Sequence, residues 1–169
     1  PNAIMATNTS SIELERIAEA LDNPNRLIGL HFFNPVAQLP LVEVIRSTLN
    51  DDDAIRLGAS FVLAIGKSLV VKSKPGFLVN RALMPYMLEA IDRVEKGESP
   101  EQLDAAAVAF GMPMGPIELM DTVGLDVGAF VAKELGQKVP EDSRFAKLLA
   151  VGKLGRKSGE GFYKWVDGK

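Results

Sequence analysis

The chain has 169 residues, of which 47% are hydrophobic and 24% are charged. This balance is typical of one globular domain or two small units, and it excludes a disordered or collagen-like chain. The net charge of -3 and the pI near 5.3 provide no basic surplus for a phosphate backbone, so nucleic acid is not an expected partner.

The chain contains no cysteine. This rules out disulfides, thiolate metal sites and cysteine nucleophiles, and it fits a cytoplasmic or organelle-matrix location. No apolar run reaches the roughly 18 residues that a membrane-spanning helix needs. The first residue is Pro1 rather than Met, directly before a predicted strand, so we expect that further sequence precedes it.

In the first half of the chain, short apolar segments alternate with helical patterns. Helices are predicted over residues 10–21 and 50–66, the first with the Ser-x-x-Glu spacing of a capping box at Ser10 and Glu13. Alternating strands and helices up to about residue 74 indicate part of a layered α/β sheet. Strands are predicted at residues 3–7, 27–32, 41–45 and 69–71.

After Lys74 the pattern becomes helical. Residues 75–96 are apolar on almost every face, which predicts a helix that is buried on all sides. The remaining sequence reads as helices separated by short turns, with one glycine-rich loop at residues 155–161. Capping and proline signals predict further helix starts at Ser99, Gly115 and Asp142.

His31 is the only histidine, and it lies at the carboxyl end of a predicted strand, where α/β sheets usually hold ligands. Imidazole can exchange a proton near neutral pH without a large environmental shift. A catalytic base is one interpretation of this position. A histidine hydrogen-bonded within the core is the other.

Glu43 interrupts a strand of branched apolar residues, and a carboxylate is almost never buried without a partner. If adjacent strands place Glu43 beside His31, it could accept the imidazole N–H, fix the tautomer and stabilise the imidazolium. The acid of a catalytic triad acts in this way. The pattern alone equally allows Glu43 to point outward from an edge strand.

Three further segments could contribute to a site. Asn80, near the start of the apolar helix, needs hydrogen-bond partners when buried, and a structural bond explains it equally well. Residues 8–11, Asn-Thr-Ser-Ser, form a strand-to-helix turn whose amides and hydroxyls could face a cofactor. The loop at residues 155–161 has the look of a phosphate cradle but lacks the P-loop and dinucleotide spacings, which favours a plain terminal loop.

Together these segments are far more specific than any one of them. They occur in a fixed order, and further matching runs at residues 113–116 and 155–163 extend the pattern over nearly the whole chain. The first four runs are Asn8-Thr9-Ser10-Ser11, His31-Phe32-Phe33-Asn34-Pro35, Leu41-Val42-Glu43-Val44 and Pro75-Gly76-Phe77-Leu78-Val79-Asn80-Arg81. On these runs the sequence resembles the 3-hydroxyacyl-CoA dehydrogenase family.

The resemblance implies an α/β remnant of a Rossmann domain at residues 1–74, followed by an all-α helical domain at residues 75–169. In that family the helical domain mediates dimerisation, so a homodimer is expected, and an acyl-CoA substrate lies between the two domains. The implied reaction is the NAD-dependent oxidation of a 3-hydroxyacyl-CoA to a 3-ketoacyl-CoA in fatty-acid β-oxidation.

The resemblance also implies roles for individual residues. His31 would take the hydroxyl proton of the substrate while the C3 hydride passes to NAD, and Glu43 would hold the imidazole. Asn80 and Ser10 would hydrogen-bond the substrate oxygen as its charge changes. The nicotinamide end of the cofactor would lie beside Asn8, Ser10 and Asn34. No metal is implied.

One family feature is absent, because no G-x-G-x-x-G occurs in the chain. We therefore expect that the chain begins in mid-domain, and that alone it binds NAD weakly and is inactive or weakly active. Residues 135–140 and 154–157 look more like multifunctional β-oxidation proteins than single-function ones. The alternatives are a short-chain 3-hydroxybutyryl-CoA dehydrogenase and a non-catalytic helical dimerisation module.

Overall fold

The computed structural model describes residues 3–10, 12–34 and 36–166. Ser11 and Pro35, which belong to two of the matching runs, lie outside the described residues, as do the first two and last three residues. The chain divides into two compact units between Arg81 and Ala82. Within the described ranges, no helix has both the length and the apolar character needed to cross a membrane.

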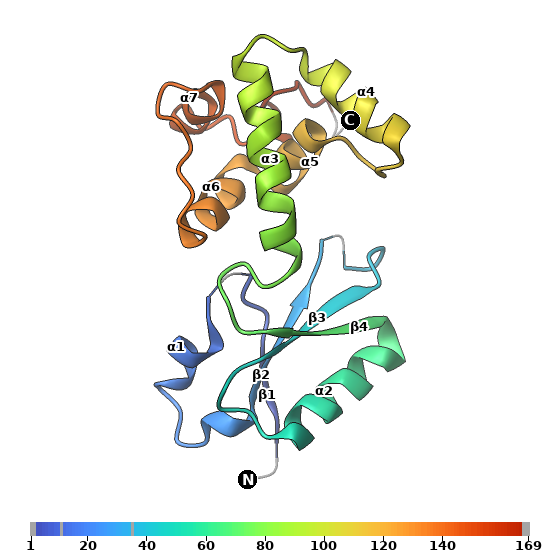
Figure 1. Ribbon diagram of the computed structural model, residues 1–169, viewed down its shortest axis with the longest axis vertical. Helices are drawn as coiled ribbons and strands as arrows, with labels where there is room; N and C mark the ends of the chain where they lie inside the picture. Colours follow the sequence, from blue (N-terminus) through green and yellow to red (C-terminus); the bar gives the residue numbers. More distant parts are fainter. Residues whose placement is uncertain (1–2, 11, 35, 167–169) are drawn as a thin grey trace. The chain divides into compact units, whose positions relative to one another are not determined.

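The first unit is built on a four-stranded sheet (Figure 1). The outer pairs, β1 with β2 and β3 with β4, are parallel, and the central pair of β2 and β3 is antiparallel. All four predicted strands are confirmed. In sheet order they are β1 (Met5–Thr7), β2 (Leu27–Phe32), β3 (Leu41–Arg46) and β4 (Lys67–Lys72).

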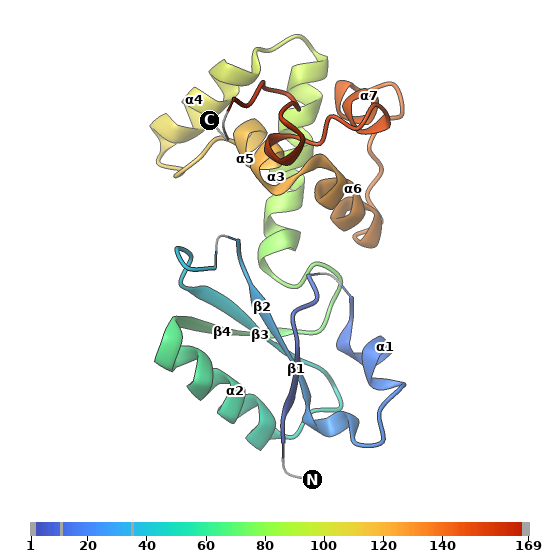
Figure 2. The same ribbon diagram turned by 180° about the vertical axis from the view of Figure 1, so that it is seen from behind.

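Helices cover both faces of this sheet. The connection from β1 to β2 contains α1 (Leu14–Ala18) and the short 3-10 helix η1 (Pro24–Arg26), and the connection from β3 to β4 contains α2 (Asp52–Ile65). Both views place α1 and α2 on opposite sides of the sheet (Figures 1 and 2). This is the layered α/β arrangement that the alternating pattern predicted.

Side chains of the strands alternate between these two faces. Leu30 and Val44 belong to an apolar cluster with α2. On the other face, Ile45 packs with Leu14 of α1 and with Phe77. Because His31 follows Leu30 and Glu43 precedes Val44, their side chains lie on the α1 face.

The helix predicted from Ser10 begins later than the capping-box pattern indicated. α1 starts at Leu14, and its N-cap residue Glu13 makes no side-chain capping bond. Thr9 Oγ1 accepts a hydrogen bond from Ile12 N at 3.1 Å in the preceding turn. The predicted capping role of Ser10 is therefore wrong.

The long apolar helix also begins later than predicted. α3 spans Val79–Glu95, because Pro75 and Gly76 form a turn in which Phe77 N donates to Lys74 O at 2.8 Å. Gly76 has a φ of 69°, which suits the third position of a type II turn with proline before it. The predicted burial of this helix on all sides is wrong, since only Ala90 and Ile91 are buried.

The second unit contains the remainder of α3 and four further helices, so the prediction of an all-helical second half is confirmed. Ser99 and Ser143 act as N-caps, accepting from Gln102 N at 3.4 Å and Ala146 N at 3.1 Å. A short 3-10 helix, η2 (Arg156–Ser158), follows. The four helices are α4 (Pro100–Phe110), α5 (Pro116–Val123), α6 (Leu125–Glu134) and α7 (Arg144–Ala150).

The buried carboxylate of Asp121 binds the glycine-rich C-terminal segment to the helices of this unit. Asp121 of α5 is 0% exposed and accepts hydrogen bonds of 2.9–3.0 Å from Phe162 N, Tyr163 N and Trp165 Nε1. A Cβ atom at Gly155 would lie 2.2 Å from the backbone O of Asp121. The glycines thus permit close packing of the loop, as a terminal loop with a structural role requires.

We expect Asp121→Ala to lower the free energy of unfolding by about 3 kcal/mol, because one buried and two half-buried donors lose their acceptor at about 1–3 kcal/mol for a buried group and less for a half-buried one. Urea unfolding followed by circular dichroism measures this. The matched control is Asp126→Ala, which removes a carboxylate whose partner Lys157 is nearly half exposed and should cost less than about 1 kcal/mol. Equal losses in the two variants would contradict this account.

Candidate active site

His31 and Glu43 meet across the antiparallel strands β2 and β3. The ladder pairs the two residues directly, and directly opposite residues point to the same face of a sheet. His31 Nδ1 lies 2.8 Å from Glu43 Oε2. His31 is 6% exposed and Glu43 is 0% exposed. Of the two orientations that the sequence allowed for Glu43, the structure has the inward one.

Glu43 meets a hydrogen-bond donor at each of its contacts. Its Oε1 accepts from Leu78 N at 3.0 Å and from Val79 N at 2.9 Å, while Oε2 faces His31 Nδ1. A carboxylate can only accept, so this arrangement suits ionised Glu43 with a proton on Nδ1 of His31. In the neutral imidazole with this tautomer, Nε2 carries a lone pair that can take a proton from another molecule.

The N-terminus of α3 adjoins the Glu43 carboxylate and further stabilises its negative charge. Val79 is the first residue of that helix, and the unpaired amides and dipole of a helix N-terminus favour a negative charge. The buried carboxylate therefore satisfies donors that the helix itself leaves unpaired.

Two phenyl rings flank the imidazole of His31. The ring centroids of His31 and Phe33 are 4.5 Å apart, and those of His31 and Phe77 are 5.5 Å apart in an edge-on arrangement. Phe77 is 3% exposed and has a φ of 49°. This left-handed conformation costs about 1–2 kcal/mol for a residue with a Cβ atom, so the surrounding contacts must hold it in place.

Asn80 and Ser10, the candidate substrate-binding residues, lie next to each other. Asn80 is in the first turn of α3, and its Nδ2 donates to the backbone O of Ser10 at 3.1 Å. Both residues are half-buried. The turn and first residues of α3 therefore contact two parts of the candidate site, the Glu43 carboxylate and the segment that contains Ser10.

A polar network fastens α1, which follows the Ser10 segment. Ser73, buried directly after β4, accepts from Leu14 N at 2.8 Å and donates to Glu15 Oε2 at 2.6 Å. Glu15 Oε1 accepts from Thr48 N at 3.1 Å. Burial raises the pKa of the Glu15 carboxyl, but the hydrogen bonds from Ser73 and Thr48 outweigh it and hold that pKa below its ordinary value.

Asn8 and Asn34 follow the carboxyl ends of the parallel strands β1 and β2. Asn8 Oδ1 accepts from Phe32 N at 3.0 Å, so this side chain joins the two strand ends. Both asparagines are exposed. Their amides and the Ser10 hydroxyl offer the donors and acceptors that a carboxamide needs. These residues fit the nicotinamide end of NAD, whereas the G-x-G-x-x-G turn that binds its pyrophosphate does not occur in the 169 residues.

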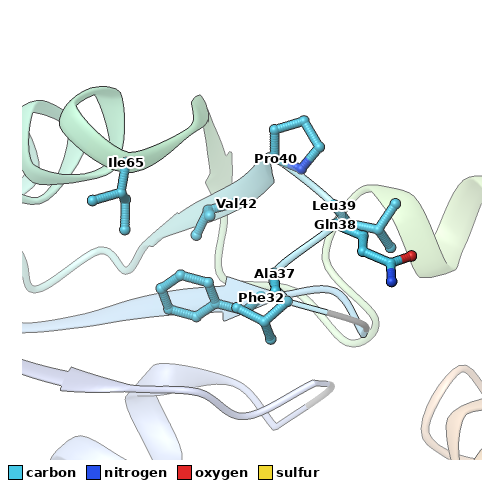
Figure 3. A pocket seen from close by; sticks show the side chains of 8 residues that line it. Phe32, Ala37, Gln38, Leu39, Pro40, Val42 and Ile65 are labelled. Carbon is cyan, nitrogen blue, oxygen red and sulfur yellow. The ribbon is translucent and has the colours of Figure 1, made fainter.

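A hollow of about 250 Å³ lies on the opposite face of the sheet from His31. Phe32, Val42 and Ile65 flank it, together with the loop residues 36–40 (Figure 3). Phe32 and Val42 belong to the α2 side of the sheet, so this hollow is separate from the dyad. Among the described residues, no group of three or more His, Asp or Glu side chains is placed to hold a metal ion.

The sequence interpretation missed four contributors to this site: the rings of Phe33 and Phe77 and the amides of Leu78 and Val79. The Pro-Gly pair before Phe77 was the available signal, because such a pair predicts a turn and a helix that begins after it. No residue pattern indicated that these amides would face a carboxylate some 35 positions earlier.

Two family models match the chain. The model described as 3-hydroxyacyl-CoA dehydrogenase, NAD binding domain, matches residues 1–74, and the one described as 3-hydroxyacyl-CoA dehydrogenase, C-terminal domain, matches residues 76–165. The fatty acid oxidation complex subunit alpha of Shewanella loihica is 45% identical over 169 residues, covering 97% of this chain and 24% of that protein. The chain thus spans about a quarter of the length of the curated relatives it matches.

Solved structures show the same similarity. FadB2 of M. tuberculosis has a TM-score of 0.92 and 38% identity, with 98% of this chain and 61% of that chain covered. The (S)-3-hydroxybutyryl-CoA dehydrogenase of Ralstonia eutropha has a TM-score of 0.88 and 36% identity, with 98% of this chain and 62% of that chain covered.

The lowered pKa of Glu15 predicts a specific pH dependence. A carboxyl whose pKa is lower in the folded state stabilises the fold at pH values above its ordinary pKa of 4.5. This contribution is lost as the pH falls through the pKa of the folded state. Glu15→Gln should therefore be less stable than wild type at pH 6, by about 1 kcal/mol or less because the group is only partly buried.

Urea unfolding at pH 6 and pH 3 tests this prediction, and the difference between the two proteins should be smaller at pH 3 than at pH 6. The exposed Glu19, at the other end of α1, provides the control Glu19→Gln, which should follow wild type at both pH values. A Glu15→Gln deficit that is as large at pH 3 as at pH 6 would contradict the assignment.

Proposed function

Because this chain belongs to the 3-hydroxyacyl-CoA dehydrogenase family, we propose that it carries the proton-transfer part of an NAD-dependent 3-hydroxyacyl-CoA dehydrogenase. The reaction would interconvert a 3-hydroxyacyl-CoA and a 3-ketoacyl-CoA in fatty-acid oxidation. The observation that carries this proposal is the buried pair of His31 Nδ1 and Glu43 Oε2, 2.8 Å apart. A general base held by a carboxylate is what removal of a hydroxyl proton requires.

In the proposed mechanism, His31 Nε2 accepts the proton of the substrate hydroxyl in the oxidation direction and returns it in reduction. Glu43 keeps the proton on Nδ1 and stabilises the imidazolium that forms, since its own charge is held by two backbone amides. Burial of the dyad excludes water and strengthens both interactions. NAD, when bound, would supply the acceptor for the C3 hydride.

The remaining site residues would bind and orient. Asn80 Nδ2 and the Ser10 hydroxyl would hydrogen-bond the substrate oxygen; their proximity, with Nδ2 3.1 Å from the backbone O of Ser10, supports this assignment. The nicotinamide end of the cofactor would be held by Asn8, Ser10 and Asn34, whose position at the ends of β1 and β2 supports it.

The same proposal includes the division of the chain into domains and the kind of longer enzyme to which the chain would belong. Residues 1–74 would form the nucleotide-domain part and residues 75–169 the helical domain. The similarity to fatty acid oxidation complex subunits favours a multifunctional parent, while the similarity to 3-hydroxybutyryl-CoA dehydrogenases favours a short-chain enzyme. The location in the cytoplasm or an organelle matrix stays a prediction.

The activity can be tested in a fusion of this chain with the part of the Ralstonia eutropha enzyme that it does not cover. We expect the unmutated fusion to oxidise 3-hydroxybutyryl-CoA with NAD, measured as NADH absorbance. His31→Ala and Glu43→Gln should each lower kcat by about 10²- to 10⁴-fold, the usual contribution of a general base or of its orienting acid.

The control for this experiment is Glu89→Gln, which changes an exposed glutamate on α3 that pairs with Arg93. It should leave kcat within about twofold of the unmutated fusion, as expected for a surface ion pair. Normal activity of His31→Ala would overturn the assignment of His31 as the catalytic base. An unmutated fusion without activity would instead favour the helical dimerisation module.

We also propose that the helical unit forms a homodimer. Its exposed apolar side chains support this, among them Phe110 at 89% and Val151 at 68% exposure, with Val127 and Phe130 on α6. Such surfaces are typical of protein interfaces. Sedimentation equilibrium should give twice the chain mass of 18.2 kDa. A monomer mass throughout the micromolar range would contradict the proposal.

A further inference from the structure

The turn that precedes α3 has an unusual conformation at a bulky residue. Among the described residues, Phe77 is the one non-glycine residue with a positive φ. Left-handed conformations are rare for aromatic residues and persist only where surrounding structure enforces them. Phe77 also adjoins both members of the dyad, since its ring contacts the imidazole of His31 and its backbone leads to the amides that donate to Glu43.

The backbone of this turn determines where the two amides point. Gly76 and Phe77 both have positive φ, at 69° and 49°. Successive N–H groups of a turn can point toward one place and so form an anion-binding concavity. Here the converging amides are those of Leu78 and Val79, and the anion is the Oε1 of Glu43.

The ring of Phe77 determines how freely the imidazole can move. It is buried in the apolar cluster with Leu14, Ile45 and Val71, so it cannot shift without disturbing the α1 face of the sheet. Its edge-on contact with His31 is at 5.5 Å, and Phe33 lies against the same imidazole at 4.5 Å. Rotation of the imidazole away from Glu43 would have to displace one of these rings.

We propose that Phe77 is the positioning residue of the dyad. Its ring holds the imidazole of His31 with Nδ1 toward Glu43, and its left-handed backbone holds the Glu43 carboxylate by aiming two amides at Oε1. Phe77 needs no contact with substrate for this role. The catalytic consequence rests on the proposed function, but the effect on the dyad geometry does not.

A purely structural role for Phe77 makes a different prediction. If the ring only fills the cluster, its removal should lower stability and leave the imidazole unchanged. The two roles can be separated by nitrogen NMR of the 169-residue chain, because His31 is the only histidine and labelled histidine gives one imidazole spectrum.

The first variant is Phe77→Leu, which keeps an apolar side chain and removes the ring. In wild type we expect one tautomer, with the proton on Nδ1. In Phe77→Leu we expect the Nδ1 and Nε2 signals to move toward each other, as the imidazole samples both tautomers. Phe77→Tyr retains the ring edge and should restore the wild-type pattern.

The second variant is Phe77→Gly, which also removes the ring but adopts the left-handed conformation without strain. It should lose the single tautomer and keep slow hydrogen exchange at the Leu78 and Val79 amides, which separates the ring from the backbone. It also provides the test if Phe77→Leu does not fold.

The matched control is Phe145→Leu, which removes a ring that is 2% exposed in the core of the second unit. It should lower the unfolding midpoint comparably and leave the His31 spectrum unchanged. If folded Phe77→Leu or Phe77→Gly retains the wild-type imidazole signals, Phe77 is a core residue only and the proposal is overturned.

The fusion enzyme distinguishes a failure of this proposal from a failure of the proposed function. Phe77→Leu should lower kcat by about 10- to 100-fold, as misplacement of a catalytic group does, and leave the KM for 3-hydroxybutyryl-CoA within about twofold. An active His31→Ala fusion would refute the proposed catalytic role of His31 and leave the effect of Phe77 on the dyad geometry untouched. An unchanged kcat in Phe77→Leu, with His31→Ala inactive, would refute the positioning role alone.

Discussion

The candidate site depends on one interaction, the burial of the Glu43 carboxylate among hydrogen-bond donors. A carboxylate removed from water is costly unless its lone pairs are satisfied, and removal of a partner leaves a penalty of several kcal/mol. Glu43 is 0% exposed, and it is compensated by two backbone amides and the imidazole of His31. Each of these partners is therefore constrained by the same charge.

This requirement connects elements that are distant in the sequence. It favours the register that pairs β2 with β3 at His31, since a shift by one residue would turn the carboxylate to the other face. It also stabilises the strained turn at Phe77 and the first turn of α3, where Asn80 contacts Ser10. The Glu43 carboxylate thus helps to hold both the proposed general base, His31, and the helix turn that carries the proposed substrate-binding residue, Asn80.

The order of the elements could be predicted from the sequence because local pattern determines it. Short runs of apolar, often β-branched residues predicted all four strands. The one carboxylate within residues 41–45, Glu43, indicated a side chain that needs a partner if buried, and Glu43 is buried. Composition around His31 did not decide its role, since a core histidine has the same pattern. The family resemblance, carried by several runs in order, supplied what single residues did not.

The failures arose where tertiary contacts override local signals. The Ser-x-x-Glu spacing at Ser10 matches a capping box, but the Leu14 amide instead bonds Ser73, a residue 59 positions away. The apolar run from Pro75 resembles continuous helix, yet a turn with two positive φ values precedes Val79. The energy that holds this turn comes from Glu43 and from the cluster around Phe77, and neither can be recognised in the residues of the turn.

The most direct test of the central claim is a measurement of scalar couplings through hydrogen bonds by NMR in the 169-residue chain. The account predicts that the amide nitrogens of Leu78 and Val79 both couple to the side-chain carboxylate carbon of Glu43, and that their protons exchange slowly with solvent. Amides that show no such coupling and exchange at the rate of an open loop would contradict it.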